Sequence, residues 1–349
     1  MIDLQPSSEQ VQIIDSVSGL LANRLPVERL LATQQANAEA EANQDYTALS
    51  EIGELGVLGL GLSEEQGGFG YSLIEEVLVA REFGRFLVSP GIMATMLAVH
   101  LVARPDEQVG ATEFVQSLKS GAISVALAVA VTSHGHLEGN EFYILDGVQA
   151  DWVLVVDEFF ACLVPRADWQ ERRAIVAIDP SVTLERAQLG NHIGSYHCSD
   201  ASLVRRARLL ASAYLVGIAE AAQESSVAYV KIREQFGQPI GAFQSVKHRC
   251  ADMLTRSSAA WSLTLFASLS EESRSSDADF QVMAAKIIAG DAASRNAAVN
   301  IQNHGGIGFT REHHAHLFVK RAHMFDLIAG SSALLKMRLL SADSPLRVS

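Results

Sequence analysis

The chain has 349 residues, of which 48% are hydrophobic and 19% charged, so it can bury a large core and is neither disordered nor fibrous. Its 27 basic and 40 acidic residues give a net charge of −13, which argues against nucleic acid or an anionic membrane as a general partner. Three widely spaced cysteines make neither a disulfide framework nor a zinc site. Residues 122–131, the most apolar stretch, are about half as long as the ~20 residues that a membrane span needs, and the N-terminus lacks the features of a signal peptide. The protein is therefore expected to be soluble and cytoplasmic.

Residues 1–120 are predicted to form a helical domain. Apolar residues recur at three- and four-residue spacing, for example over residues 11–21. A glycine-rich loop at residues 55–72 leads into a further helix, where Ser72 and Glu75 have the spacing of a capping box.

Residues 121–200 are predicted to form a small β domain. Short runs rich in β-branched and aromatic residues are separated by turn signals, among them Asp146-Gly147 and Asp179-Pro180. The predicted strands lie in ISVALAVAV, EFYILDG, DWVLVVDEFFACLV and AIVAID.

Residues 201–349 are again predicted to be helical, and no internal repeat is found. One long helix is expected to reach about Glu234, and others to begin at about Ser245, at about Ala278 and near Asp326. The fold class is therefore predicted to be α+β, with an N-terminal helical domain, a small middle β domain and a C-terminal four-helix bundle.

The segment REQFGQPIGAFQSVKHRCADM, which begins at Arg233, contains a break between two helices. Gly237 and Pro239 interrupt the chain, and Ser245 is placed to cap a new helix. Such a corner exposes backbone N–H groups beside an arginine, which suits a phosphate group. An ordinary turn within a helical bundle explains the same residues, so the pattern alone leaves both interpretations open.

Three ordered segments resemble the acyl-CoA dehydrogenase family. REQFGQPIGAFQ, followed by ADM, is similar to the family's first C-terminal signature, and IQNHGGIGFTREHHAHLFVKRA, residues 301–322, is similar to its second. LGVLGLGLSEEQGGFGYS looks like the family's N-terminal loop. The helix–β–helix order extends the resemblance over essentially the whole chain.

The resemblance implies that the protein binds FAD and that the cofactor lies between subunits of a dimer or tetramer. Arg233 and Phe236 match the pair that holds the FAD diphosphate and adenosine across the interface, and Gln244 matches the glutamine after the signature's aromatic position. The residues of the second signature that match contacts from the other subunit are Gln302, Gly305 and Gly306. Glycine has no Cβ to obstruct a diphosphate. A solvated arginine at a helix end and an ordinary helix-terminating turn are the alternatives.

The activity implied by the resemblance is α,β-dehydrogenation of an acyl-CoA thioester. A carboxylate removes the α-proton while hydride passes to the flavin, and burial must raise the pKa of that carboxylate. In most of the family it belongs to a Tyr-Glu-Gly-Thr segment, which residues 328–331 match, with Ala329 at the glutamate position. In a minority it lies on the long helix, at the position that Ala207 matches. Both base positions therefore hold alanine, so no catalytic residue is assigned.

The β domain lacks two further features of the family. The Thr-Glu-Pro…Gly-Ser-Asp loop and the Trp-x-Thr-Asn strand, which cover the flavin ring, have no counterpart in AVAVTSHGHLEGNEF. Thr132, Ser133 and His134 are the candidate remnant of that loop. The domain is therefore interpreted as abbreviated.

Arg208 is the candidate substrate residue, because it matches a frequent active-site arginine of the family. An exposed position in the basic run of Arg205, Arg206 and Arg208 is the alternative. That run is also a place where the phosphates of coenzyme A or an acidic partner could bind.

Several histidines are grouped near the C-terminus, but no carboxylate or cysteine pattern completes a metal geometry around them. They are interpreted as solvated or interface residues: His304, His313, His314, His316 and His323. His134 and His136 form an isolated pair on an expected loop.

The sequence thus favours a degenerate acyl-CoA dehydrogenase subunit that pairs with a catalytically intact homologous subunit, as an α2β2 heteromer. This arrangement is similar to the heteromeric enzymes of bacterial sterol side-chain catabolism, and the family implies an electron-transfer flavoprotein as acceptor. One alternative is a self-sufficient homo-oligomer whose base is Asp326, Glu64 or Glu65. Another is a non-enzymatic scaffold that binds neither FAD nor acyl-CoA.

Overall fold

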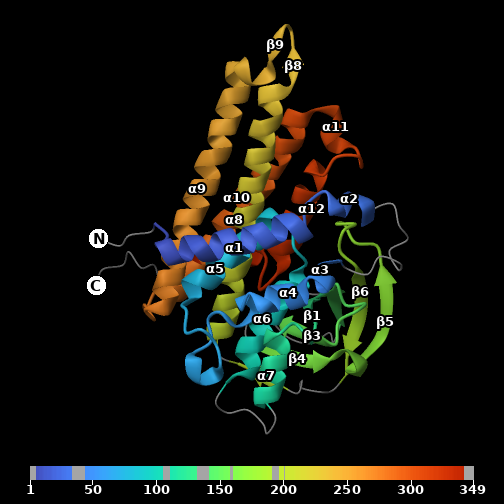
Figure 1. The fold of residues 1–349 in the computed structure, drawn as a ribbon, viewed down its shortest axis with the longest axis vertical. Helices are drawn as coiled ribbons and strands as arrows, with labels where there is room; N and C mark the ends of the chain where they lie inside the picture. Colours follow the sequence, from blue (N-terminus) through green and yellow to red (C-terminus); the bar gives the residue numbers. More distant parts are fainter. Residues whose placement is uncertain are drawn as a thin grey trace.

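The computed structural model describes residues 5–33, 44–104, 111–131, 141–157, 160–190, 196–199 and 201–341. Long helices of the C-terminal part run along the longest axis of the molecule, and the sheet lies beside the N-terminal helices at one end (Figure 1). The α+β class and the predicted order of helices, sheet and helices are confirmed. Among the helices that the structure describes, none is long and apolar enough to cross a membrane.

The N-terminal part is helical, and its helix α6 is almost completely buried, between β1, α7 and α8. The capping box at the start of α5 is confirmed: the Ser72 hydroxyl accepts from the Ile74 N–H, and the Glu75 carboxylate accepts from the Ser72 N–H. His100 is the one residue of α6 that is not buried. The elements are α1 (Ser8–Arg24), α2 (Arg29–Thr33), α3 (Gln44–Thr47), α4 (Leu49–Glu54), η1 (Val57–Gly59), η2 (Glu64–Gln66), α5 (Leu73–Arg85), α6 (Pro90–Val102) and α7 (Ala111–Lys119).

The sheet has the strand order β5-β6-β2-β1-β3-β4-β7, with β1 and β3 parallel and the other pairs antiparallel. The run DWVLVVDEFFACLV supplies two strands, β3 and β4, rather than one. AIVAID is wrong as a strand beyond Ile175, since the pairing of β5 with β6 ends at the pair Ile175 and Leu184. The strands are β1 (Val125–Ala130), β2 (Glu141–Leu145), β3 (Trp152–Val156), β4 (Ala161–Pro165), β5 (Trp169–Ile175), β6 (Leu184–Leu189) and β7 (Tyr196–Cys198).

The C-terminal part is a bundle built on three long helices, α8 (Ala201–Ile232), α9 (Gln244–Glu272) and α10 (Ala278–His304). The expected cap at Ser245 is wrong, because α9 already begins at Gln244 and Phe243 precedes it without a side-chain cap. The expected helix start near Asp326 is also wrong, because Asp326 lies in the last turn of α12. The shorter elements are η3 (Arg166–Asp168) in the sheet region, and β8 (Glu234–Gln235), β9 (Gln238–Pro239), η4 (Ile240–Ala242), α11 (Gly306–Phe309), α12 (Ala315–Leu327) and α13 (Ser332–Ser341) in the bundle.

The N-terminal part and the bundle meet where α5 crosses α8. A Cβ at Gly217 would lie 2.0 Å from the Arg81 carbonyl oxygen, and one at Gly84 would lie 1.9 Å from the Tyr214 carbonyl oxygen. The two helices therefore touch through their backbones, which only glycine permits at these positions. This crossing fixes the middle of α8, which follows Ala207 and Arg208 along the helix, against α5.

Candidate functional site

The six residues matched to FAD contacts lie at one end of the C-terminal bundle (Figure 1). The rings of Tyr229 on α8 and His304 at the end of α10 stack with their centroids 4.2 Å apart. The Asn303 amide on α10 donates to the Ser226 hydroxyl on α8 at 2.6 Å. These contacts hold the end of α10 beside the end of α8, and so bring the two signature segments together.

The β8–β9 hairpin forms the tip of this end. Phe236 and Gly237 both have positive φ, 54° and 79°, as a two-residue hairpin turn requires. The Phe236 side chain is 92% exposed, and its ring meets the edge of Phe243, with centroids 6.1 Å apart. Arg233 and Gln244, on either side of the hairpin, are exposed as well. The Phe236 ring and the Arg233 guanidinium therefore lie on the surface, where a ligand or another chain can cover them.

The turn after α10 supplies the glycine pair. Gly305 has φ 65° and ψ −142°, a backbone conformation that is essentially restricted to glycine. A Cβ at Gly305 or Gly306 would meet no described atom within 4 Å, and Gln302 is exposed beside them. The surface above this turn is open, so a planar or anionic group can approach the backbone. Together with Arg233 and the amides of Gln302 and Gln244, this donor set fits a diphosphate.

The two positions that match the family's catalytic base are buried in a different part of the bundle from this tip. Ala329 is 2% exposed with φ 56°, and Ala207 is 0% exposed. The Arg208 Nε donates to the Ala329 carbonyl oxygen at 2.9 Å. Neither alanine side chain offers a group that can accept a proton.

Arg208 is buried, with 3% of the residue exposed, so the interpretation of it as an exposed arginine is wrong. Burial lowers the pKa of its guanidinium, although the Asp279 carboxylate opposes that shift. Its Nη1 lies 3.5 Å from Asp279, and its Nη2 is buried with no hydrogen-bond partner among the described residues. A buried cationic donor is therefore left unsatisfied beside Ala329, at a free-energy cost of about 1–3 kcal/mol.

The three carboxylates considered as alternative bases, Asp326, Glu64 and Glu65, are either hydrogen-bonded or exposed. The Asp326 carboxylate accepts from the Ser332 N–H at 3.3 Å and from its hydroxyl, so it caps α13. The Lys286 ammonium is buried and donates to the Asp326 carbonyl oxygen at 3.0 Å, and burial lowers the pKa of Lys286 to about 8. Glu64 and Glu65 are exposed in η2. None of these three carboxylates is the buried, unengaged group that a general base requires.

The basic run at the start of α8 is not an open cationic patch. The Arg205 Nε lies 2.5 Å from Glu271, and the Arg206 guanidinium donates to the buried Glu76. Carboxylates therefore already neutralise part of the charge of this run, and its binding of coenzyme A phosphates or of an acidic partner stays a prediction.

The grouped histidines are mostly packed rather than solvated. His304 and His316 are buried, and the His313 ring stacks on His314 with centroids 4.5 Å apart and lies tilted against His304 at 4.4 Å. Burial and the neighbouring histidines lower the pKa of His313 to about 4, so its ring is neutral at pH 7. Within the residues that the structure describes, no group of three or more His, Cys, Asp or Glu could hold a metal ion. Thr132, Ser133, His134 and His136 lie outside the described residues.

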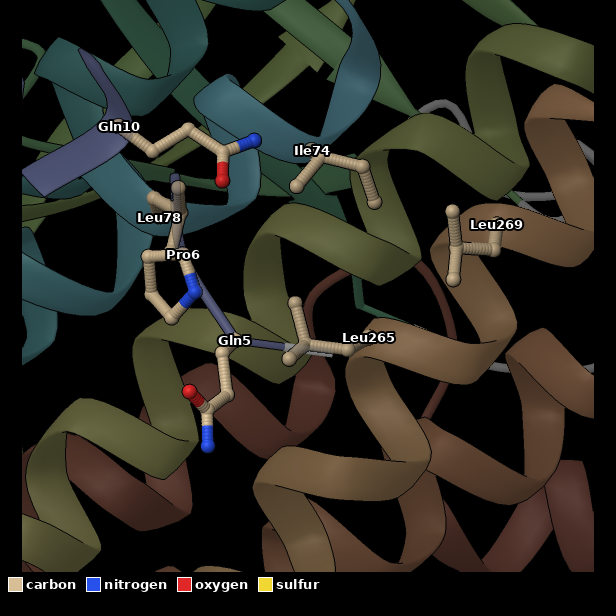
Figure 2. Close-up of a pocket in the computed structure, with 7 residues that line it drawn as sticks. All are labelled: Gln5, Pro6, Gln10, Ile74, Leu78, Leu265 and Leu269. Carbon is tan, nitrogen blue, oxygen red and sulfur yellow. The ribbon is translucent and has the colours of Figure 1, made fainter. Parts of the chain in front are cut away.

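A small pocket between the N-terminal segment, α5 and α9 has a volume of about 110 Å³ (Figure 2). Its walls are the apolar side chains of Ile74, Leu78, Leu265, Leu269 and Pro6, and its polar groups are the amides of Gln5 and Gln10. None of these seven lining side chains is titratable, so they supply no group for acid–base chemistry.

Comparisons with known proteins identify the family. The family model described as "Acyl-CoA dehydrogenase, N-terminal domain" matches residues 7–126, and the model described as "Acyl-CoA dehydrogenase, C-terminal domain" matches residues 201–342. The chain is 30% identical over 336 residues to acyl-CoA dehydrogenase IpdE2 of Mycobacterium tuberculosis, and the match covers 95% of each protein. It therefore belongs to the acyl-CoA dehydrogenase family, whose members carry out flavin-dependent dehydrogenation.

Two solved structures show the same fold. The ChsE4-ChsE5 complex from Mycobacterium tuberculosis superposes with a TM-score of 0.79 at 20% identity, covering 98% of this chain and 100% of the other. A Tcur3481-Tcur3483 steroid ACAD variant superposes with a TM-score of 0.76 at 19% identity, covering 95% and 97%.

Proposed function

We propose that this chain is the base-less subunit of a heteromeric acyl-CoA dehydrogenase, and that it completes the FAD site of a homologous subunit that carries the glutamate. The observation that carries the proposal is the burial of alanine at both base positions, Ala329 and Ala207. The Arg208 Nη2 beside Ala329, which has no partner in the part of the chain that the structure describes, supports it, because this donor would face a carboxylate if residue 329 were glutamate. An α2β2 assembly gives each FAD one intact subunit and one of these chains.

The tip of the bundle supplies the contribution to the cofactor. When bound, FAD provides the acceptor for the hydride that leaves the acyl group. Arg233 would pair with the diphosphate, the exposed Phe236 ring would cover the adenosine part, and the backbone at Gly305 and Gly306 would approach the phosphates. Gln244 and Gln302 would donate amide hydrogen bonds from both sides of this tip.

The proposed substrate is an acyl-CoA thioester, and the proposed electron acceptor is an electron-transfer flavoprotein. One structural neighbour is a steroid ACAD, and that name supports a bulky steroid-derived acyl group for the heteromer. Arg208 would contact this substrate through Nη2, since Nε is already held by the Ala329 carbonyl oxygen.

The test is to purify the chain alone and together with a homologous subunit that has an intact Tyr-Glu-Gly-Thr segment. We expect a colourless, inactive protein alone, and a yellow complex that oxidises acyl-CoA. Full flavin content and turnover by the isolated chain would instead establish the self-sufficient enzyme. A complex in which this chain adds neither flavin nor turnover would establish the scaffold.

The contribution of the tip is tested within the complex. Arg233→Ala and Phe236→Ala should each lower its flavin content while the two subunits still co-purify. Arg295→Ala is the matched control, because Arg295 is an exposed arginine on α10 whose ion pair with Asp291 is local to that helix. Equal flavin loss in the Arg295→Ala complex would remove the assignment of the tip.

A further inference from the structure

The outer face of α9 carries exposed apolar side chains and very little charge. The helix lies at the edge of the bundle and packs with its inner face against α8 and α10 (Figure 1). Between Met253 and Ser270 its only charged residue is Arg256, whose Nε donates to the Asn296 side-chain oxygen at 2.9 Å. The exposed residues that we call the α9 face are Ala251, Leu254, Thr255, Ser258, Ser262 and Phe266. Leu254 and Phe266 are 55% and 40% exposed, which is typical of a surface that another chain covers.

Two hydroxyl groups of the α9 face are already satisfied within the helix. The Thr255 hydroxyl donates to the Ala251 carbonyl oxygen at 3.0 Å, and the Ser262 hydroxyl donates to the Ser258 carbonyl oxygen at 3.0 Å. Such a hydroxyl can leave water without losing its hydrogen bond. The face can therefore be covered by a second helix without leaving these donors unpaired.

The exposed charges in line with the α9 face are separated at the two ends of the helix. Lys247 and His248 are exposed in its first turns, and Glu272 is exposed at its last residue. The Glu272 carboxylate accepts from the Leu73 N–H at 3.3 Å through Oε1, which leaves Oε2 for another donor. One end of the face is therefore basic and the other acidic.

Two further acidic residues near these ends lie off the face. Glu271 is directed towards α8, where the Arg205 Nε lies 2.5 Å from its carboxylate. Asp252 is exposed but lies about 100° around the helix from Ala251. Neither of them changes the separation of charge along the face.

The residues of the face are placed symmetrically about Ala260. Leu254 and Phe266 are equally far from it along the chain, and so are Ser258 and Ser262. His248 at the basic end and Glu272 at the acidic end are also equally far from it. When a helix packs antiparallel to a copy of itself, with a two-fold axis at residue 260, the two members of each such pair lie opposite one another on different copies. Apolar groups then meet apolar groups, and the basic end meets the acidic end.

We propose that two copies of this chain associate through the α9 face, as an antiparallel pair of α9 helices with a two-fold axis beside Ala260. Leu254 of one copy packs against Phe266 of the second, and His248 and Lys247 pair with Glu272 of the second. A parallel pair would instead bring like charges together at both ends, which is unfavourable. Charge complementarity of the face with itself therefore favours a second copy as the occupant.

This contact does not depend on the proposed FAD contribution. None of the six residues assigned to the FAD-binding tip belongs to the α9 face. In an α2β2 heteromer the contact would join the two copies of this chain. Either assignment can fail without the other.

The first experiment is sedimentation equilibrium of the isolated chain over a range of concentrations. We expect a reversible dimer with twice the mass of the 37.6 kDa chain. Leu254→Arg and Phe266→Arg should each raise its dissociation constant by about tenfold or more, because each places a charge in an apolar contact. Ile288→Arg is the matched control, since Ile288 on α10 is 42% exposed and lies off the α9 face. A wild type that stays monomeric, or equal weakening by Ile288→Arg, would overturn the proposal.

The register is tested by cross-linking under a mild oxidant. The double variant Leu254→Cys and Phe266→Cys should form a disulfide-linked dimer, because the two positions lie opposite one another. Leu254→Cys alone should not, since its two copies are separated by about 18 Å along the helix axis in the antiparallel pair. Efficient cross-linking of Leu254→Cys alone would indicate a parallel pair and contradict the proposal.

The heteromer provides the last comparison. Leu254→Arg should reduce an α2β2 complex to half its mass while its flavin content per homologous subunit stays unchanged. If Leu254→Arg instead prevents the homologous subunit from co-purifying, that subunit occupies the α9 face and the pairing of two copies is wrong.

Discussion

At the scale of single residues, the proposed loss of the catalytic base centres on Ala329 and its buried neighbour Arg208. Arg208 is buried and directs Nε to the backbone of Ala329, while Nη2 has no hydrogen-bond partner among the residues that the structure describes. A guanidinium cannot lose its proton at neutral pH, so it remains charged in an apolar setting. On the proposed function, the energetic penalty of that unsatisfied donor should be relieved by a carboxylate at position 329.

Ala329→Glu should therefore stabilise the folded chain relative to Ala329→Gln. The two side chains have nearly the same size, so the difference between them isolates the charge on residue 329. Pairing the glutamate with Arg208 should raise the free energy of unfolding by about 1–3 kcal/mol over the glutamine variant. Urea denaturation of both variants measures the difference. Equal stabilities would show that the Arg208 Nη2 does not reach a carboxylate at this position.

Some of this site can be predicted from the sequence, and some cannot. The alanines at positions 207 and 329 can be found from the sequence alone. Once these segments are matched to the family's base-carrying segments, the residue type at each position is read directly and no three-dimensional information is required. The burial of Arg208 is not predictable, since three arginines within four positions are typical of a solvated helix face. Its burial depends on the helices and on the 328–331 segment that pack around α8, which are distant in the sequence.

At the scale of elements, the tip of the bundle combines two turns that depend on glycine for different reasons. Gly305 needs glycine because of its backbone conformation, with φ 65° and ψ −142°. Gly306 begins α11, and a methyl group added to its Cα would meet no described atom within 4 Å, so this chain's own packing does not require glycine there. If glycine is nevertheless required at position 306, the requirement would therefore come from a ligand that approaches the backbone there.

Gly305→Ala and Gly306→Ala should consequently separate folding from cofactor binding. Gly305→Ala should lower the free energy of unfolding by about 1–3 kcal/mol because alanine is strained in that conformation. Gly306→Ala should change it by less than about 0.5 kcal/mol, as for an exposed position, yet lower the flavin content of the heteromer. Thermal melting of the isolated chain and flavin absorbance of the complex measure the two effects. Normal flavin content with Gly306→Ala would argue against close approach of FAD at this turn.

The elements also show where sequence patterns fail. The capping box of α5 is predictable because it is local, depending on Ser72 and Glu75 alone. The strand β6 is missed because LERAQL does not alternate apolar and polar residues: its buried positions are Glu185, Ala187 and Leu189, and the charged Glu185 is recognisable as buried only once β2 and β5 pair with the strand. The start of α9 is misplaced by one residue because Phe243 precedes the helix without any side-chain cap.

At the scale of the whole molecule, a buried polar network joins the three parts of the chain. Arg321 on α12 is 1% exposed and donates to Asp179 at 2.6 Å, to the carbonyl oxygens of Leu87 and Val88, and to the Tyr214 hydroxyl at 2.8 Å. These partners come from the sheet region, the N-terminal helices and α8. The network therefore fixes the relative position of the parts that border the candidate site.

Arg321→Met should be among the most destabilising single substitutions in the protein. Removal of the guanidinium leaves the fully buried Asp179 carboxylate without its cationic partner, which costs about 3–5 kcal/mol. Arg295→Met is the control, since its exposed pair with Asp291 should contribute less than about 1 kcal/mol. Urea denaturation of both variants gives the comparison. Similar free energies of unfolding for the two would mean that the network does not join the parts of the chain energetically.

The same junction should make stability depend on pH through Asp146. This carboxyl is 1% exposed, and burial raises its pKa to about 6, although hydrogen bonds from Ser89 and Thr183 oppose the shift. A group whose pKa is higher in the folded state than its unfolded value of about 3.9 stabilises the fold fully below that value. The contribution is lost as the pH rises through 6, because the folded state then has to hold a buried carboxylate that the unfolded chain ionises freely.

Asp146→Asn removes this titration while keeping an oxygen for the Thr183 N–H. The stability of the wild type relative to Asp146→Asn should therefore fall by about 1 kcal/mol between pH 5 and pH 8. Denaturant unfolding of both proteins at the two pH values measures this difference, and Asp291→Asn, at an exposed position on α10, should show no such change relative to the wild type. A relative stability that stays constant or increases between pH 5 and pH 8 would contradict the raised pKa. Because Asp146 accepts from Ser89, which caps the start of α6, the loss of stability at high pH should be accompanied by faster amide exchange at the start of that helix.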